Sequence, residues 1–270
     1  MPRTIQTERL CALVTGGARN IGLAIARELA SAGVNVGVLD ICRNLRTLPY
    51  ELASREEMEG ALEGLSSLGT EVLGLFCDVR SPEGVEKAMG EFIGKFGRLD
   101  ILVNNAGVSS LVPVTRMSVE AWDEVVDVCL KGTFLCCRAA IPHMMDRGGG
   151  RIINIASVAG VRGLGLSAHY CAAKHGVIGF TKALAAETAD HHILVNAVCP
   201  GTVETGILPG LAAQAGVSGE PYAHFSRGHL LKDVRIRPSH IADLVKWLAL
   251  EEKGAITGSV LPVDGGWTAL

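Results

Sequence analysis

Short apolar segments recur along the chain and are separated by longer segments in which apolar residues repeat every three or four positions. The short segments do not alternate apolar with polar residues, which is typical of parallel strands covered on both faces. The expected strands are Leu10–Thr15, Val34–Asp40, Val72–Asp78, Leu99–Asn104, Arg151–Ala156, Leu194–Val198 and Ser259–Val263. The expected helices are Ile21–Ala32, Val85–Phe96, Val119–Asp146, Ala168–Ala189 and Ile241–Leu250. This order predicts a single α/β, doubly wound domain over 1–270, with seven parallel strands and helices on both faces.

Two segments are longer than such a fold requires. The insertion, residues 41–70, begins as a loop that contains Tyr50 and continues as a helix from near Ser54. Ser54 with Glu57 matches the capping-box pattern of a helix start. Residues 202–238 are rich in Gly, Pro and His and have no clear period, so we expect a substrate lid there. A surface elaboration is the alternative for the insertion.

The composition narrows the class of protein. Of the 270 residues, 48% are hydrophobic and 20% charged, which favours a sizeable core over disorder. The net charge of -3 provides no basic excess for binding nucleic acid. No apolar run approaches the roughly 18 residues of a membrane span, and the first residues lack the pattern of a secretory signal. We therefore expect a cytoplasmic protein with no membrane partner.

The eight cysteines form no CxxC pair and have no histidines near them at zinc spacing. Most stand inside apolar strand or helix patterns. We expect no metal site, and we interpret the cysteines as small buried apolar residues in a reducing compartment.

A glycine-rich turn, residues 15–22, joins the first expected strand to the first helix. Backbone N–H groups and a helix N-terminus in such a turn can face a pyrophosphate, and Gly22 allows the helix to pack close to the sheet. A tight turn without a ligand is the alternative.

An acid, Asp40, ends the second expected strand. A carboxylate there can accept hydrogen bonds from an adenosine ribose and would repel a 2′-phosphate, so it favours NAD over NADP. A solvated strand-end carboxylate is the alternative. Arg19, Arg43 and Arg46 are close in sequence and could serve a phosphate instead.

Polar residues also end the third and fourth expected strands, at Asp78-Val79 and at 104–107. The carboxyl ends of parallel strands are where ligands bind in such sheets. For Asn104, a structural role that joins neighbouring strands is an equal alternative.

Tyr170 and Lys174 stand four positions apart near the start of an expected helix and therefore share a helix face. An ammonium beside a phenol stabilises the phenolate and lowers the tyrosine pKa from its usual value of about 10. Such a tyrosine can give or take a proton at an alcohol or carbonyl oxygen. Ser157 ends the fifth expected strand, where its hydroxyl could bond the same oxygen. The tyrosine–lysine spacing alone is common by chance.

Together these features resemble the short-chain dehydrogenase/reductase family in its NAD(P)-binding Rossmann form. The resemblance implies that Tyr170 is the general acid/base, that Ser157 orients the substrate oxygen, and that Lys174 lowers the Tyr170 pKa and holds the nicotinamide ribose. The matching motifs follow the family order and nearly span the chain: TGGARNIG at 15–22, Asp40, CDV at 77–79, NNAG at 104–107, Ser157, Tyr170 with Lys174, and PGTVET at 200–205.

The same resemblance implies where the coenzyme binds. Val203 and Thr205 would contact the carboxamide, and Asn105 and Gly107 would line the adenosine ribose. The residues expected at the coenzyme are Gly16, Arg19, Asn20, Ile21, Gly22, Asp40, Ile41, Asp78, Val79, Asn105, Ala106, Gly107, Tyr170, Lys174, Pro200, Gly201, Val203 and Thr205.

Two residues depart from the family pattern. Asn20 replaces a glycine of the turn, and asparagine tolerates left-handed backbone better than most residues. Cys129 replaces an asparagine that in the family helps to hold a water relaying protons to the lysine. Cysteine hydrogen-bonds weakly, so the resemblance leaves that relay in doubt.

A narrower resemblance concerns the insertion. The motifs DIC at 40–42, TLPYELA at 47–53 and IPHM at 141–144 resemble carveol-dehydrogenase-like, mycofactocin-associated members. In that group the insertion lies over bound NAD. This resemblance implies a tightly held NAD and a hydrophobic, terpenoid-like secondary alcohol as substrate.

The sequence leaves two rivals to an NAD-dependent alcohol dehydrogenase or ketoreductase of class EC 1.1.1.-. One is a 3-oxoacyl-carrier-protein-type ketoreductase, which would have a basic patch near the lid. The other is a nucleotide-binding regulatory protein with weak catalysis, a reading that only Cys129 favours. The family resemblance also implies a homotetramer, in which the helices at 119–146 and 168–189 pair between subunits.

Overall fold

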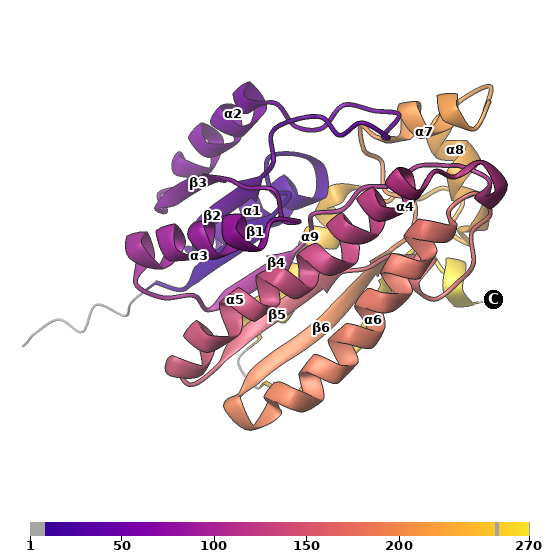
Figure 1. Cartoon of the computed structure of the whole chain (residues 1–270). Coiled ribbons are helices and arrows are strands. Elements are labelled where there is room, and N and C mark those ends of the chain that lie inside the picture. The colour runs from indigo at the N-terminus through magenta and orange to yellow at the C-terminus, as the bar shows by residue number, and fades with distance from the viewer. Residues whose placement is uncertain (1–8, 252–253, 270) are drawn as a thin grey trace, which may run out of the picture.

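The computed structural model describes residues 9–251 and 254–269, and its centre is one seven-stranded parallel sheet (Figure 1). The strand order is β3-β2-β1-β4-β5-β6-β7. The strands are β1 Cys11–Thr15, β2 Asn35–Asp40, β3 Val72–Phe76, β4 Ile101–Asn104, β5 Gly150–Ile155, β6 Ile193–Pro200 and β7 Val260–Val263. Chain order reverses between β1 and β4, so β1 begins one half of the sheet and β4 the other. The doubly wound Rossmann-type architecture is thus confirmed.

Helices cover both faces of the sheet and give it two apolar cores. On one face α3, α5 and α6 pack over a core that contains Phe92, Leu135 and Leu184, and on the other α1, α2 and α9 pack over Ile25, Met58 and Val245. The helices are α1 Asn20–Ser31, α2 Arg55–Ser66, α3 Pro82–Phe96, α4 Val119–Val126, α5 Gly132–Asp146, α6 Ala168–Thr188, α7 Leu208–Gln214, α8 Pro221–Phe225 and α9 Pro238–Leu250.

The insertion has the helix start that its sequence predicts. The Glu57 amide donates to the Ser54 hydroxyl at 3.1 Å, and the Ser54 amide donates to the Glu57 carboxylate at 2.8 Å. This capping box satisfies two amides that the first turn of α2 would leave without partners. Residues 41–54 therefore form a loop between β2 and α2, and Figure 1 shows it reaching toward α7.

The long helix expected at 119–146 is interrupted. A π-helical turn, Asp127–Lys131, separates α4 from α5. Directly after this turn the chain passes close to the segment that follows β3: a Cβ on Gly132 would lie 2.7 Å from Val79. Thr133 also donates its hydroxyl to the Cys129 carbonyl at 2.9 Å. Such turns are frequent at functional sites.

The segment at 202–238 contains the short helices α7 and α8, which its irregular sequence did not predict. Residues 1–8 and 270, which belong to the expected domain of 1–270, lie outside the described residues. Within the described residues, no helix combines the length and the apolar character that a membrane crossing requires.

Candidate active site

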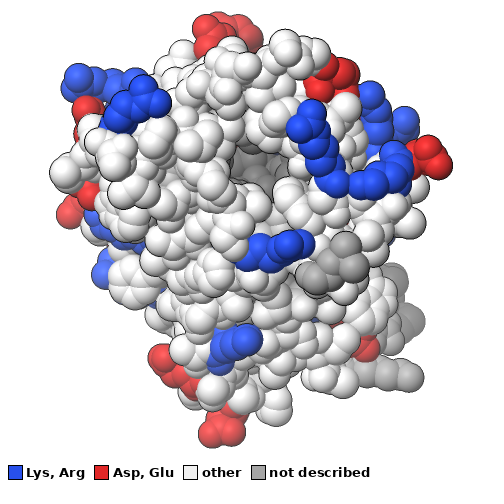
Figure 2. All heavy atoms as spheres, turned by 90° about the vertical axis from the view of Figure 1, so that its right-hand side faces the viewer, with Lys and Arg blue, Asp and Glu red and all other residues white. Residues whose placement is uncertain are grey.

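A cavity of about 330 Å³ opens at the carboxyl edge of the sheet. Figure 2 shows a hollow in this face of the molecule, bordered mostly by uncharged side chains. Every residue that the sequence assigned to catalysis or to the coenzyme lines this one cavity, although these residues lie between positions 16 and 205. The insertion adds Leu45, Tyr50, Leu52 and Ala53, and the lid adds Ile207, Leu208, Leu211 and Phe225.

The glycine turn forms one wall of the cavity and is held by Asn105. The Asn105 side-chain amide donates to the carbonyls of Thr15 at 3.0 Å and Gly16 at 2.9 Å. Gly16 has a φ of 61°, and a Cβ on Gly22 would lie 2.1 Å from the Gly16 carbonyl oxygen. Asn20 has a φ of 50°, the left-handed backbone that its residue type tolerates. These contacts leave no room for a side chain where a pyrophosphate would approach.

Asp40 is buried at the end of β2, with both carboxylate oxygens facing backbone amides. Ala18 donates to one oxygen at 3.2 Å and Cys42 to the other at 3.3 Å. Burial raises the pKa of Asp40, and the amides together with Arg19 counteract that rise. A carboxylate in this position can receive ribose hydroxyls, as the sequence predicted.

The three arginines that could have served a phosphate have other partners. Arg43 pairs with Asp78 at 3.1 Å, and Arg46 pairs with Glu120 at 3.5 Å. Arg19 donates to the backbone carbonyl of Glu51. Arg19 lies close enough to Asp40 to lower its pKa, but Arg43 and Arg46 are paired with other carboxylates, so the three arginines do not form one phosphate site.

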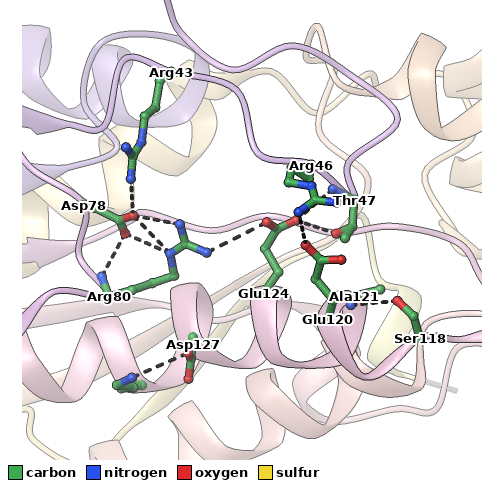
Figure 3. A network of polar contacts seen from close by, with 11 residues as sticks. Arg43, Arg46, Thr47, Asp78, Arg80, Ser118, Glu120, Ala121, Glu124 and Asp127 are labelled. Carbon is green, nitrogen blue, oxygen red and sulfur yellow. Dashed lines mark hydrogen bonds and ion pairs between the residues drawn. The ribbon is translucent and has the colours of Figure 1, made fainter.

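Asp78 belongs to a polar network that ties the insertion to α4 (Figure 3). Arg80 donates to both Asp78 oxygens and lies 3.8 Å from Glu124. The buried Glu124 in turn accepts the Thr47 amide at 3.1 Å and the Thr47 hydroxyl. Burial would raise the pKa of Asp78, but the hydrogen bonds from Arg80 and Arg43 lower it below its ordinary value. We call this set, Arg43, Thr47, Asp78, Arg80 and Glu124, the latch.

Ser157, Tyr170 and Lys174 come together above the end of β5. Ser157 hydrogen-bonds Tyr170, and the Ser157 oxygen also accepts the Ala159 amide at 3.1 Å. The buried Lys174 donates from Nζ to the Ile155 carbonyl at 2.7 Å, and Nζ lies 5.6 Å from the centre of the Tyr170 ring. The ammonium is thus aimed at a backbone carbonyl.

The pKa of Tyr170 differs from the sequence expectation. Burial raises it above the ordinary tyrosine value, the Cys129 thiol adds to the rise, and the bond with Ser157 lowers it by less. The lowered pKa that we expected from Lys174 is not found, because desolvation of the buried phenol is the larger effect. The raised pKa favours the protonated phenol, which is the form that donates in the direction of reduction.

Cys129 lies in the π-helical turn and bonds the loop that follows β4. Its Sγ accepts the Val108 amide at 3.4 Å and donates to the Val108 carbonyl at 3.3 Å. A Cβ placed on Gly107 would meet Sγ at 3.6 Å and Lys174 Nζ at 3.4 Å. The thiol therefore holds the loop directly behind Lys174, even though cysteine is a weak hydrogen-bonding residue.

Asn104 and two buried histidines near the site have structural contacts. Asn104 donates to Asn154 at 2.8 Å, which joins β4 to β5, so the structural alternative holds for this residue. The buried His169 bonds Ser110 at 2.8 Å, and the buried His229 accepts the Thr202 amide at 3.1 Å. Neither histidine lines the cavity, whereas Phe225 of the lid does. All eight cysteines are free.

The sequence did not identify the functional contacts of Tyr50, Thr47 and Glu124. Tyr50 lines the cavity, and its oxygen accepts the Ser109 amide at 2.9 Å. The only local signal was the position of Tyr50 in an insertion. Among the described residues, no group of three or more His, Cys, Asp and Glu side chains is arranged to hold a metal ion.

Known proteins share this fold and much of this sequence. D-beta-hydroxybutyrate dehydrogenase of Rhizobium meliloti is 39% identical over 269 residues, which cover 96% of this chain and 98% of that protein. The 3-oxoacyl-[acyl-carrier-protein] reductase of Synechocystis is 36% identical over 256 residues, covering 94% and 95%.

Among solved structures, carveol dehydrogenase from Mycobacterium avium in complex with NAD superimposes with a TM-score of 0.92 at 30% identity. The match covers 98% of this chain and 99% of that one. It agrees with the carveol-dehydrogenase-like resemblance of the sequence. The family model for short chain dehydrogenase matches residues 10–215. The chain therefore belongs to the short-chain dehydrogenase family.

Proposed function

We propose that this protein is an NAD-dependent oxidoreductase that interconverts an uncharged, apolar secondary alcohol and its ketone. The observation that carries the proposal is that Ser157, Tyr170 and Lys174 line the same cavity as the glycine turn and Asp40. A proton-transfer group and a dinucleotide site on one cavity are the two parts that this reaction needs.

The residues present fit NAD. The glycine turn offers backbone amides and the N-terminus of α1 to a pyrophosphate, and Gly22 keeps that approach open. Asp40 would bind the ribose hydroxyls and repel a 2′-phosphate. The pairing of Arg43 with Asp78 and of Arg46 with Glu120 supports NAD over NADP.

NAD, when bound, supplies the acceptor or donor of the hydride that is exchanged with the carbinol or carbonyl carbon. Tyr170 gives its proton to the carbonyl oxygen in reduction and takes the alcohol proton in oxidation. Ser157, already bonded to Tyr170, orients the substrate oxygen between the two hydroxyls. Lys174 places a buried positive charge beside the Tyr170 ring, where it stabilises a phenolate formed during oxidation.

The cavity walls support an apolar substrate. The charged residues among those that line the described cavity are Arg19, Asp40, Asp78 and Lys174, and each has a place in the coenzyme or catalytic machinery. The remaining walls include Leu111, Val158, Leu164, Leu208, Leu211, Phe225 and Trp267. Because no further cation among these residues could hold a carboxylate, a short hydroxy acid such as hydroxybutyrate fits this cavity poorly.

A carrier-protein ketoreductase is the second candidate, since the lid exposes Arg227, Lys232, Arg235 and Arg237. Basic side chains are visible around the hollow in Figure 2. However, Arg235 pairs with Glu204 at 2.6 Å and with Glu220 at 3.4 Å, which reduces the charge available to an acidic partner. We therefore rank this candidate below the alcohol dehydrogenase.

The test is an assay of purified protein with NAD and a panel of secondary alcohols, together with acetoacetyl thioesters and the corresponding NADH-dependent reductions. We expect turnover of the apolar alcohols and a loss of about 10²- to 10⁴-fold in kcat for Tyr170→Phe, the range for removing a general acid/base. Coenzyme binding by the variant should be unchanged. Unaltered alcohol oxidation by Tyr170→Phe would contradict the assignment, and turnover of thioesters alone would favour the second candidate.

Two further properties belong to the proposal. The latch and the cover formed by the insertion support tight retention of NAD. Exposed apolar side chains on α4 and α5, Val119, Trp122 and Phe134, support self-association through these helices, with a homotetramer as the expected assembly. We expect the protein in the cytoplasm.

A further inference from the structure

Tyr50 is one of the insertion residues that line the active-site cavity, and it is the one that carries a hydroxyl group there. It lines the cavity with Ser157 and Tyr170, and its phenol oxygen accepts the Ser109 amide at 2.9 Å. Its backbone is fixed from the other side by the lid, because a Cβ on Gly210 of α7 would lie 2.8 Å from Tyr50 Cβ. The phenol is therefore held between the loop after β4 and the lid.

The hydroxyl proton of Tyr50 has no acceptor within residues 9–251 and 254–269. The phenol oxygen receives the Ser109 amide and donates to none of these residues. A phenol can both accept and donate, so one donor at the cavity wall is left for a ligand. Tyr50 is half-buried at the cavity wall, and an oxygen acceptor in the cavity would complete the hydrogen bonding of its hydroxyl.

The position of Tyr50 points to the substrate rather than to the coenzyme. Ser109 follows Gly107 in the sequence and precedes the apolar residue Leu111, and all three line the cavity. Tyr50 is also near the catalytic tyrosine, since a negative charge on Tyr50 would raise the pKa of Tyr170. The phenol therefore lies at the same cavity as the catalytic tyrosine, where the body of the substrate would lie.

We propose that Tyr50 is a specificity-determining residue that donates a hydrogen bond to a second, uncharged oxygen of the substrate, apart from the oxygen at the reacting carbon. This inference rests on the proposed function and narrows its substrate class to apolar secondary alcohols or ketones that carry an ether, carbonyl or further hydroxyl oxygen. The insertion thus contributes to substrate choice as well as to the cover over the coenzyme site.

The test compares substrates of the same shape with and without an acceptor. The 2-, 3- and 4-methoxycyclohexanols are each paired with the corresponding ethylcyclohexanol, which replaces the ether oxygen by a methylene group. We expect the wild type to prefer one methoxy isomer over its ethyl partner by about fivefold in kcat/KM, the effect of one uncharged hydrogen bond. Tyr50→Phe should reduce this preference to below twofold and leave turnover of the ethyl compound nearly unchanged.

Tyr222→Phe is the matched control. Tyr222 is a buried tyrosine whose phenol oxygen, like that of the half-buried Tyr50, accepts a backbone amide, here from Ile236 at 2.6 Å, but it does not line the active-site cavity. It should keep the wild-type preference. The proposal is overturned if the wild type has no preference in any pair, if Tyr50→Phe slows both members equally, or if it alters only NAD retention.

Calorimetric binding of the same pairs to the NAD-loaded protein separates this inference from the proposed function. Preferred binding of a methoxy compound that Tyr50→Phe abolishes, without any turnover, would uphold the role of Tyr50 and overturn the dehydrogenase. Turnover of both members with equal efficiency would uphold the dehydrogenase and overturn the role of Tyr50. Absence of both binding and turnover in every pair would overturn the substrate class proposed here.

Discussion

The floor and the roof of the cavity are built in different ways. The floor consists of strand ends and the glycine turn, where Asn105 bonds the carbonyls of Thr15 and Gly16 and where Gly22 leaves no space for a side chain. The roof consists of the insertion and the lid, which are held by side chains such as Thr47 on Glu124 and Asn20 on Gly206. A disruptive substitution in the floor should therefore abolish coenzyme binding, whereas one in the roof should change the rate at which bound coenzyme is released.

Gly22→Ala is expected to have the largest effect, because it places a methyl group 2.1 Å from the Gly16 carbonyl and 2.6 Å from the Asn105 amide. Because the Gly16 carbonyl is a backbone group and cannot move aside as a flexible side chain can, the start of α1 must move away from the turn. We expect NAD affinity to fall by at least about 100-fold, which corresponds to roughly 3 kcal/mol. Coenzyme titration followed by fluorescence measures the loss.

Gly206→Ala in the lid is the matched control, since nothing lies within 4 Å of a Cβ at that position. It should bind NAD as the wild type does. Equal losses in the two variants would mean that the floor and the roof do not differ as described. A circular-dichroism melt shows whether Gly22→Ala still folds.

The floor could be predicted from sequence because its parts are local. Asp40 ends an apolar strand, the glycine turn joins a strand to a helix, and parallel strands bring such ends to one edge. The left-handed backbone at Asn20 followed from its residue type. These signals need only a few neighbouring residues, and the structure lines one cavity with all of them.

The roof could not be predicted in the same way, because its contacts join distant residues. Tyr50 and Ser109 are 59 positions apart, and Thr47 and Glu124 are 77 apart. No periodic pattern connects such pairs. The π-helical turn Asp127–Lys131 was missed as well, because the sequence there follows an ordinary helical period. The raised pKa of Tyr170 likewise depends on burial, which the tyrosine–lysine spacing does not reveal.

Glu124→Gln tests the roof at the buried carboxylate that holds the insertion. The substitution keeps the shape of the side chain but removes the charge that accepts from Thr47 and faces Arg80. Hydrogen bonds to a charged group exceed neutral ones by about 1 to 1.5 kcal/mol, so we expect NAD to leave about tenfold faster. The turnover number at saturating NAD should change by less than about twofold, because Glu124 does not line the cavity.

The measurement is the amount of NAD that remains after gel filtration and is then released by denaturation. Glu120→Gln is the control, since the exposed Arg46–Glu120 pair contributes little. Wild-type protein that emerges without NAD after gentle purification would contradict tight retention. Equal loss of NAD in both variants would mean that the buried Glu124 contributes no more to retention than the exposed Glu120.

Arg43→Gln probes the outermost part of the latch and should have the smallest effect. The Arg43 side chain is 66% exposed, so its pair with Asp78 is screened by water, and we expect NAD release to accelerate only about twofold. The pH dependence has a definite sign. Because the pKa of Asp78 is lowered in the folded chain, the contact persists at every pH above the ordinary aspartate value of about 3.9. It is lost only as the pH falls through the lowered pKa.

Titration of Asp78 should therefore leave the rate of NAD release from the wild type unchanged between about pH 5 and 8. The rate should rise below about pH 4. Arg43→Gln should flatten part of that acid rise, because Arg43 is the residue through which Asp78 holds the insertion loop. Stopped-flow displacement of NAD across this range provides the rates, with the more exposed Arg46→Gln as control. If NAD release accelerates about twofold in Arg43→Gln and about tenfold in Glu124→Gln, the buried Glu124 carboxylate contributes most of the stabilisation of the insertion loop. Equal effects would mean that the loop is held evenly along its length.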